Sequence, residues 1–415
     1  MTGSAVAQAI GFALTPVISR LYNPADFGIF GSFSAVSGVI AAAVTLEYSR
    51  ALMLPKKDDD AINVFVVSCL STFIIAFMCL AICLIFSAFV NGLMKTDGIW
   101  ALILLATATL IFGLNQSCQA WCVRVKAFKH TSASQVIRSV SSNSAQIGFG
   151  LLKSGSPGLI VSSILADLLA GINLMRVLIP DLLALRHAVR WERMKQLAAE
   201  YRDFPLYSAS QGVINAVSAG LPVLLLNHFF GIAVAGAYAF GMRILHAPMS
   251  FVLTALRQVL FQKAAETQHQ GRLLSPLYIK ITAGLFGIAL LPSMVLLIWA
   301  PPIFTWVFGS QWQTAGIFAR SLVLWMLFVF CNVPAVLFAR LIRIQRAVFF
   351  YDLLLLAARV TTLILGGLYL TASHTVMLFA VVGAVMNFIL IVLVGYAVMK
   401  KESRLSWNHM RDSIR

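Results

Sequence analysis

The 415-residue chain is 60% hydrophobic and 11% charged, and its mean hydropathy of +0.88 excludes an ordinary soluble globular protein. Its 31 basic and 15 acidic residues give a net charge of +16, but the basic residues are scattered between apolar runs, so they indicate membrane orientation and no nucleic-acid partner is expected. The sequence therefore predicts a multi-pass membrane protein with little mass outside the bilayer.

Apolar runs long enough to cross a bilayer predict an all-α integral membrane protein of about twelve transmembrane helices. The first run starts almost at Met1, without a basic segment or a small-residue cleavage site, so no cleavable signal peptide is expected. The abrupt start fits either a true N-terminus further upstream or a trimmed one. The runs lie at roughly 2–21, 27–54, 61–90, 98–122, 132–152, 157–179, 205–230, 233–260, 276–300, 315–339, 347–371 and 373–399.

The longest connection between these runs, about 180–204, is too polar to span. Trp191, Met194 and Leu197 recur there at helical spacing beside basic residues, which predicts an amphipathic helix on the cytoplasmic surface. This linker divides the chain into an N-terminal lobe (1–179), the linker helix (180–204), a C-terminal lobe (205–400) and a tail (401–415). With the N-terminus inside, about 23 Lys and Arg residues face the cytoplasm and three face outside, so both termini are predicted to be cytoplasmic.

Landmarks recur in the same order in the two halves. A proline in the first helix precedes a glycine at the start of the second, and an asparagine in the fourth helix precedes an arginine in the fifth. Because six is an even number, the two halves share one orientation, and a substrate site between two six-helix lobes is expected. The landmarks are Pro16, Gly28, Asn115 and Arg138 in the first half, and Pro222, Gly236, Asn332 and Arg359 in the second.

The run 234–260 carries a polar stripe on an otherwise apolar helix. An arginine near the middle of the membrane costs at least a few kcal/mol if it faces lipid, so the stripe has to face protein or a wet cavity. Two interpretations stay open for Arg243: pairing with a carboxylate that holds helices together, or lining a cavity that receives a negatively charged group. His246 is either a titrating group or a hydrogen-bonded packing residue. The stripe consists of Arg243, His246, Ser250, Thr254 and Arg257, which lie within an arc of about 80°.

Other helices carry similar stripes, which indicate either a water-lined cavity or close packing through small residues. Acidic residues within the runs are few, and for each of them structural pairing is as open as a role in ion coupling. The candidate substrate-binding residues are Arg243, Arg138, Arg359, His246, Gln211, Asn215 and Gln8, and the candidate ion-coupling residues are Glu47, Asp167 and Asp352.

Motifs of catalysis do not occur: the sequence lacks a Walker loop, an HExxH helix and a GxSxG turn, so the protein is not expected to be an enzyme or to use a cofactor. The six cysteines fall inside predicted spans without His or acidic partners, which favours packing over metal binding.

Several segments resemble one family closely. Residues 19–30 read SRLYNPADFGIF, and this segment, with 46–55, 204–208, 220–226 and 308–312, resembles bacterial polysaccharide-biosynthesis membrane proteins. Over essentially its whole length the chain is similar to the lipid-linked oligosaccharide (O-antigen repeat unit) flippases of the multidrug/oligosaccharidyl-lipid/polysaccharide exporter superfamily. The resemblance implies a V-shaped, two-lobed bundle in the bacterial inner membrane, in which helices 1, 2, 7 and 8 line the cavity.

The resemblance also implies the activity: ion-coupled transfer of an undecaprenyl-pyrophosphate-linked glycan to the outer leaflet for O-antigen, capsule or exopolysaccharide synthesis. Expected partners are this lipid-linked glycan, membrane lipid and the polysaccharide polymerase machinery, with the protein acting as a monomer. A multidrug cation exporter of the same superfamily is the alternative, which the scarcity of buried acids disfavours. A membrane-bound polymerase or ligase would need a sizeable outer loop, which the sequence lacks.

Overall fold

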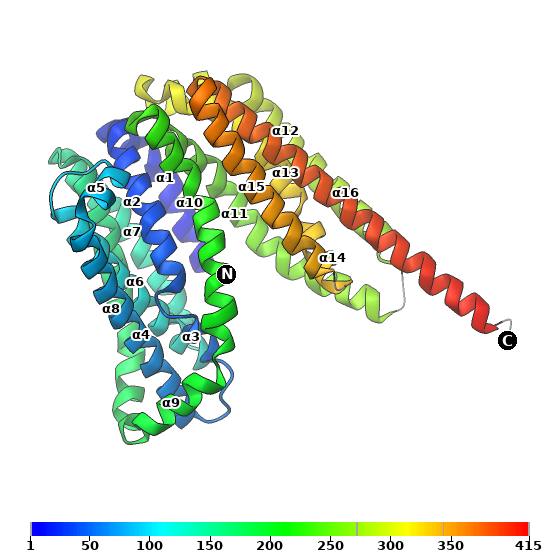
Figure 1. Cartoon of the computed structure of the whole chain (residues 1–415), viewed down its shortest axis with the longest axis horizontal. Coiled ribbons are helices and arrows are strands. Elements are labelled where there is room, and N and C mark those ends of the chain that lie inside the picture. The colour runs from blue at the N-terminus through cyan, green and yellow to red at the C-terminus, as the bar shows by residue number, and fades with distance from the viewer. Residues whose placement is uncertain (1, 271–272, 343, 414–415) are drawn as a thin grey trace. The chain divides into compact units, whose positions relative to one another are not determined.

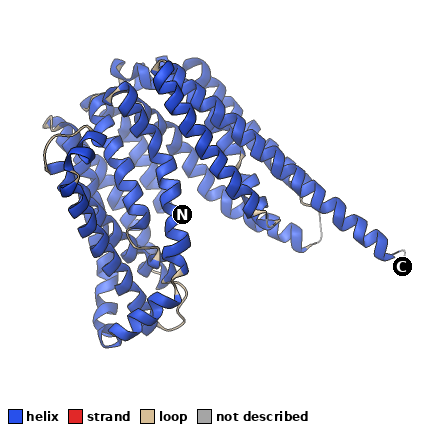
Figure 2. Ribbon diagram, in the orientation of Figure 1, coloured by secondary structure: helices blue, strands red, loops and turns tan. Residues whose placement is uncertain are grey.

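The computed structural model of the chain describes residues 2–270, 273–342 and 344–413. In these ranges the chain is almost entirely helical, with short loops between the helices, and no strand occurs in them (Figures 1 and 2). The helices are α1 (Thr2–Leu21), α2 (Pro24–Ala43), α3 (Tyr48–Ala51), α4 (Asp58–Ile85), α5 (Ser87–Met94), α6 (Trp100–Arg124), α7 (Phe128–Leu151), α8 (Gly155–Leu185), η1 (Arg186–Ala188), α9 (Trp191–Glu200), η2 (Phe204–Ala209), α10 (Ser210–Phe230), α11 (Ile232–His269), α12 (Ser275–Phe308), η3 (Ser310–Trp312), α13 (Gln313–Cys331), α14 (Val333–Leu341), α15 (Gln345–Tyr369) and α16 (Ala372–Ser413).

The predicted all-helical membrane fold is confirmed, because each of the twelve predicted runs coincides with a long helix or a pair of consecutive helices. Nine stretches of the described chain are long and apolar enough to cross a bilayer, and they lie over α2, α4, α6, α8, α10, α12, α13–α14, α15 and α16. The remaining three predicted spans are α1, α7 and α11. The Ser-rich sequence of α7 lowers its hydropathy, and the total of twelve spans stays a prediction.

Three predicted runs are interrupted: 61–90 divides at Phe86 into α4 and α5, and the other two breaks have a clear backbone cause. The run 27–54 ends as α2 at Ala43, because Leu46 and Glu47 both adopt left-handed backbone conformations with φ of 48° and 60°. The run 315–339 breaks into α13 and α14 at Asn332, just before Pro334, whose ring cannot continue the preceding hydrogen-bonding pattern. Hydropathy registers only apolar length, so neither break was visible in the pattern.

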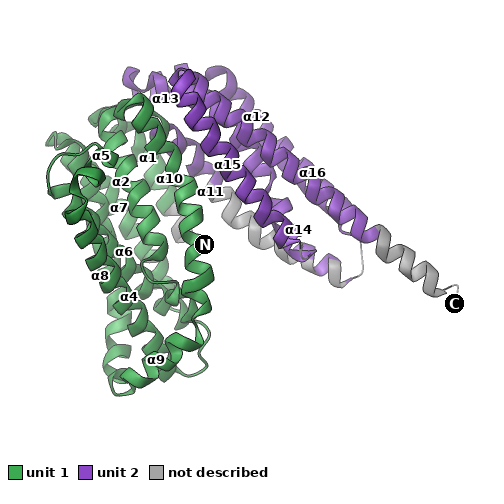
Figure 3. Cartoon of the chain, in the orientation of Figure 1, with its two compact units in different colours: residues 1–239 green, residues 240–415 purple. Residues whose placement is uncertain are grey.

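Two compact units make up the chain: residues 1–239 and 240–415 (Figure 3). In unit 1, α7 packs with α8 and α1, α6 packs with α8 and α4, and α10 packs along α2. In unit 2, α13 packs between α12 and α16, and α15 packs on α16. Helix α10, which opens the predicted C-terminal lobe, thus lies against α2 within unit 1. The lobe boundary predicted at 204/205 stays a prediction.

The start of α2 explains the most distinctive segment of the sequence. Asn23 caps the helix by accepting a hydrogen bond from the Asp26 backbone N–H at 2.9 Å, and the Asp26 carboxylate accepts one from the Asn23 N–H at 3.1 Å. Pro24 occupies the first helical turn, where its missing N–H has no cost. Tyr22 and Phe27 are buried on either side of this cap with their rings edge to face, so the cap is fixed in the core.

Helices α2 and α11 cross at their first turns through two glycines. A Cβ atom on Gly28 would collide with the carbonyl oxygen of Ile232, and a Cβ on Gly236 would collide with the carbonyl oxygen of Pro24. The contact is reciprocal, since each glycine lies four residues after the residue whose carbonyl the other glycine meets. Gly28 and Gly236, one pair of the landmarks that recur in the two halves of the sequence, therefore touch one another in the folded protein.

The linker helix α9 packs on the ends of α3 and α4. Met194 and Leu197 are buried, whereas Trp191 is 60% exposed. The Arg193 guanidinium pairs with Asp60 at 2.7 Å, and the Tyr48 hydroxyl donates to the Ala198 carbonyl at 3.1 Å. These contacts tie the linker to unit 1, and its position on a membrane surface stays a prediction.

Candidate functional site

Arg243 lies in the first half of α11, within unit 2, and is half-buried. Among the side chains that the structure describes, it forms no ion pair and no hydrogen bond. His246, one turn further along, is exposed. A guanidinium whose five donors meet no partner among the described side chains is suited to receive an anion from outside the protein. The side chains of Ser250, Thr254 and Arg257, the rest of the predicted stripe, lie outside the described part of the structure.

Arg138 and Asp167 meet across α7 and α8 in unit 1. The guanidinium makes a two-point contact, with Nε on Oδ1 and Nη2 at 3.4 Å from Oδ2. The Arg138 side chain is 53% exposed and that of Asp167 only 13%. Arg138, a predicted substrate-binding residue, thus pairs with Asp167, a predicted ion-coupling residue. The arginine remains half exposed in this pair.

A polar ladder extends from this pair along the same two helices. The Asn115 amide donates to the Asp167 carbonyl oxygen at 3.2 Å, and the Ser134 hydroxyl donates to the Ala170 carbonyl at 3.0 Å. The Asn173 amide donates to the Ser134 hydroxyl at 2.8 Å. Because these bonds hold α8 against α7 and α6, they fix the backbone on either side of the ion pair.

Gln8 lies on α1 where this helix faces α7. Its carbonyl oxygen is buried and accepts no hydrogen bond in the described structure, and the same holds for the side-chain oxygens of Asn143 and Gln146. The Ser139 hydroxyl donates to the Ala7 carbonyl at 2.5 Å and joins the two helices. Asn143 and Gln146 were not among the predicted site residues. Their spacing of four and seven residues after Ser139 places all three on one face of α7, which was the available signal.

Gln211 and Asn215 lie on the first turns of α10 and are exposed. Among described residues their side chains take part in no hydrogen bond, so both amides are available to a polar ligand. The wide π-helical turn η2 precedes them, and Gly220 further along the helix packs on Ala35 of α2. The helix therefore has one face fixed to α2, with the two amides outside that contact.

Arg359 in α15 packs against aromatic rings. Its guanidinium carbon lies 4.6 Å from the Trp325 ring centroid and 5.7 Å from that of Phe379. Gly383 of α16 makes room for the indole, since a Cβ there would come within 2.8 Å of it. Asp352, two turns earlier on α15, is exposed. A cation on the face of a tryptophan is stabilised by the ring electrons, and among the described residues Arg138 makes no such contact.

Glu47 lies outside the stretches that can span a membrane, between α2 and α4. Glu47 is only 4% exposed, and its carboxylate pairs with the Arg50 guanidinium at 2.8 Å. Burial raises the pKa of this carboxyl, and Arg50 partly offsets the shift. The left-handed conformation of Glu47 is costly for a residue with a side chain, so the surrounding packing holds it in place.

A model of the polysaccharide biosynthesis protein family matches residues 17–316. The chain belongs to this family. No match was found among curated proteins.

Solved structures of two kinds share the fold. The lipid II flippase MurJ in an inward closed conformation is 11% identical, with a TM-score of 0.73 and coverage of 100% of both chains. An inward-facing MATE family multidrug resistance transporter of the MOP superfamily is 15% identical, with a TM-score of 0.72 over 96% of this chain and 95% of the other. An outward-facing MATE family transporter gives a TM-score of 0.62 at 14% identity, over 98% and 94%. At these identities the likeness establishes the fold, which is that of MATE and MurJ.

Proposed function

We propose that this protein is a flippase that moves an undecaprenyl-pyrophosphate-linked oligosaccharide across the bacterial inner membrane for cell-surface polysaccharide synthesis, such as O-antigen, capsule or exopolysaccharide. The family supports the pathway, and the shared fold supports a transporter rather than an enzyme. The observation that carries the proposal is Arg243, a cation on the long helix α11 without an ion-pair partner among the described side chains.

The chemistry of the cargo matches this arginine. A lipid-linked glycan can leave its polyprenyl chain in the bilayer, but its pyrophosphate has to cross the hydrocarbon. Arginine binds phosphate oxygens with two parallel N–H donors, and its charge offsets that of the anion. The exposed amides of Gln211 and Asn215 are suited to sugar hydroxyls, which need both donors and acceptors.

The alternative is a multidrug cation exporter, because one protein that shares the fold is a multidrug resistance transporter. A cavity for organic cations needs carboxylates that are available to the ligand. In the described structure Asp167 is paired with Arg138, and Glu47 is paired with Arg50 outside the spans. Asp352 is exposed on α15, so among the three candidate acids two are engaged and one is open. The two engaged acids favour an anionic cargo.

Ion coupling is part of the proposal, with H⁺ or Na⁺ as the driving ion. The Arg138–Asp167 pair is suited to it because protonation of the carboxylate removes the partner charge from an arginine that is already half exposed. An ion shifts the transport equilibrium only if it binds one conformation better than another, so the pair has to be intact in one state and open in the other.

The decisive experiment uses Arg243→Ala and Arg243→Lys in proteoliposomes that contain a defined lipid-linked oligosaccharide. We expect flipping to fall by about tenfold or more in Arg243→Ala, and Arg243→Lys to recover part of it, because lysine lacks the planar fork. Arg320→Ala, at an exposed arginine in α13, is the control and should flip normally. Wild-type flipping in Arg243→Ala would refute the site, and loss of folded protein would assign Arg243 a structural role. Extrusion of a cationic dye by the wild type without lipid flipping would favour the exporter.

Orientation is tested separately with single cysteines in a cysteine-free background. We propose that both termini are cytoplasmic, so cysteines at the exposed positions Asp97 and Thr371 should react with an impermeant thiol reagent added outside. A cysteine at the exposed Glu200 on the linker helix should react only after lysis. The opposite labelling pattern would invert the proposed topology. The proposal further has the flippase act as a monomer beside the polysaccharide polymerase machinery.

A further inference from the structure

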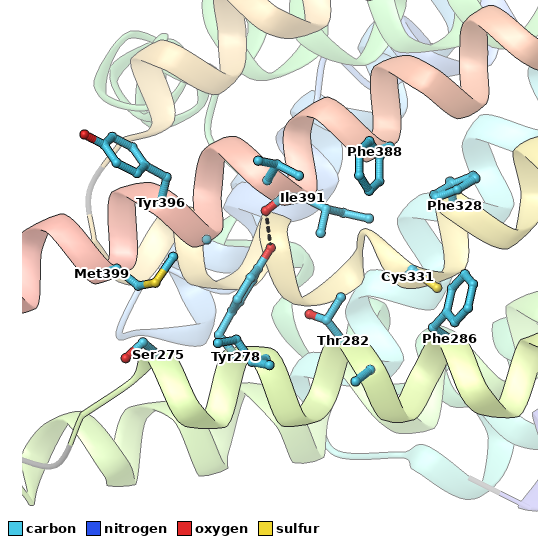
Figure 4. Close-up of a pocket in the computed structure, with 14 residues that line it drawn as sticks. Ser275, Tyr278, Thr282, Phe286, Phe328, Cys331, Phe388, Ile391, Tyr396 and Met399 are labelled. Atoms are coloured by element: carbon cyan, nitrogen blue, oxygen red, sulfur yellow. Dashed lines mark hydrogen bonds between the residues drawn. The ribbon is translucent and has the colours of Figure 1, made fainter.

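An apolar groove of about 490 Å³ runs along unit 2 between α12 and α16, with α13 contributing to its inner end (Figure 4). Phe286, Phe328 and Phe388 gather at one end of it, whereas Ser275, Tyr396 and Met399 lie at the other (Figure 4). Both of the long helices are membrane-spanning candidates, so most of the groove lies at the depth of the hydrocarbon.

Tyr278 forms a fixed floor for this groove. Its hydroxyl donates to the Ile391 carbonyl at 2.7 Å, and its ring packs edge to face on Phe338 with centroids 5.3 Å apart. Opposite the ring, Gly395 removes the side chain that would otherwise fill the space, since a Cβ there would lie 3.0 Å from Tyr278 Cε1. The groove is therefore a built feature of the α12–α16 contact, and the Tyr278 hydroxyl is already satisfied.

The walls of the groove are open to the bilayer. Ile279, Phe388 and Val392 are each more than half exposed. Water has few hydrogen-bond partners in such a groove, and an empty groove would forfeit contacts with its lining. A hydrocarbon chain is the occupant that satisfies both conditions.

Positive charge collects at the end of the groove marked by Tyr396 and Met399. The Lys400 ammonium lies 5.8 Å from the Tyr396 ring centroid, and the neighbouring Lys401 is exposed. Glu402, next in the chain, accepts hydrogen bonds from the Leu274 and Ser275 backbone N–H groups and from the Ser275 hydroxyl, and so caps α12. Lys400 and Lys401 are both exposed beside this cap, so two cationic groups lie at this end of the groove.

We propose that this groove is a binding site for an anionic phospholipid of the membrane, with one acyl chain against Tyr278 and Phe388 and the phosphate headgroup at Lys400 and Lys401. The lipid is distinct from the transported cargo and joins the exposed sides of α12 and α16. An apolar slot that ends in a tyrosine and lysines at the interface matches the amphipathic character of such a lipid.

The test measures lipid retention by the purified full-length protein with native mass spectrometry, using phosphatidylglycerol and phosphatidylcholine as probes. Ala283→Trp places a large side chain in the groove, and the double variant Lys400→Gln/Lys401→Gln removes the charges. We expect the affinity for phosphatidylglycerol to fall by about tenfold in each. The matched controls are Ile288→Trp, at an exposed position on α12 outside the groove, and Lys56→Gln/Lys57→Gln in unit 1. Both should bind like the wild type.

Three results would overturn the proposal. Equal affinity for the two lipids would rule out a headgroup-specific site. Unchanged phosphatidylglycerol affinity in a correctly folded Ala283→Trp variant would rule out the groove as the place where the lipid binds. Displacement of phosphatidylglycerol by polyprenyl phosphate, together with lost flipping in Ala283→Trp, would assign the groove to the cargo. Lipid retention is measured without transport, so failure of the flippase assay would not change the outcome of this test.

Discussion

The two halves of the chain agree at their glycines and differ at their arginines. Gly28 and Gly236 occupy equivalent places and make the same contact, each against a backbone carbonyl of the other helix. Arg138 and Arg359 are equivalent in the predicted repeat, yet Arg138 pairs with Asp167 and Arg359 packs on Trp325 and Phe379. A close backbone crossing allows only glycine, whereas a cation can be stabilised by a carboxylate or by aromatic rings. The glycine contact is thus common to the two halves, and these contacts of the two arginines differ.

The largest effect should come from disrupting the contact between α2 and α11 at Gly28 and Gly236, to which both halves contribute. Gly236→Ala forces the backbones of α2 and α11 apart, because the added methyl group would overlap the Pro24 carbonyl oxygen. We expect loss of most folded protein, measured by size-exclusion chromatography of the detergent extract. Gly38→Ala is the control on α2, since a Cβ at Gly38 meets nothing within 4 Å. A well-folded Gly236→Ala protein would show that the two helices do not need this crossing.

The next effect should separate the two arginines. Trp325 is 8% exposed, and Trp325→Ala removes both a buried indole and the surface on which Arg359 packs. We expect a loss of about 3–5 kcal/mol in unfolding free energy, seen as a strongly lowered melting temperature. Trp325→Phe keeps a ring and should lose much less. If both variants melted equally, the aromatic contact with the guanidinium would contribute nothing to stability.

A smaller stability effect is expected at the ion pair. Asp167→Asn removes the charge opposite a half-exposed arginine, which water can solvate, so stability should change by about 1 kcal/mol or less. Between acid and neutral pH, the flipping rate of the Asp167→Asn protein should vary less with pH than the flipping rate of the wild type. Equal pH dependence in the variant would exclude Asp167 as the proton-sensing group, and a melting loss as large as that of Trp325→Ala would make the pair structural.

The smallest effect should appear at Glu47. Burial raises the pKa of this carboxyl, so the folded protein holds its proton more tightly than the unfolded chain does. Stability from this group is then highest at low pH and falls as pH rises from the unfolded pKa, about 4.3, through the higher folded pKa. Glu47→Gln should melt a few degrees above the wild type at neutral pH, with the gap closing toward pH 4. Asp97→Asn, at an exposed loop acid, is the control. A gap that stayed constant with pH would contradict the raised pKa.

Much of the fold followed from the sequence. Apolar length located every long helix, and the order of landmarks predicted correspondence between the halves. The break at Leu46 and Glu47 was missed because a change in backbone direction leaves no trace in hydropathy. The helical wheel put Arg138 on a polar face, but it could not show that Asp167 on the next helix lies opposite, since periodicity describes one helix at a time. The sequence of α15 showed that Arg359 is a charged residue within an apolar run. It could not show the rings packed against Arg359, because Trp325 and Phe379 belong to α13 and α16.

The crossing of α2 and α11 has the form of a self-complementary contact. In each direction a glycine meets a carbonyl that lies four residues before the glycine of the other helix, as happens when two identical surfaces associate about a two-fold axis. Each glycine makes room for the backbone of the other helix, so a side chain at either position would open the whole junction. The two positions therefore behave as one unit, and a substitution at one cannot be compensated at the other.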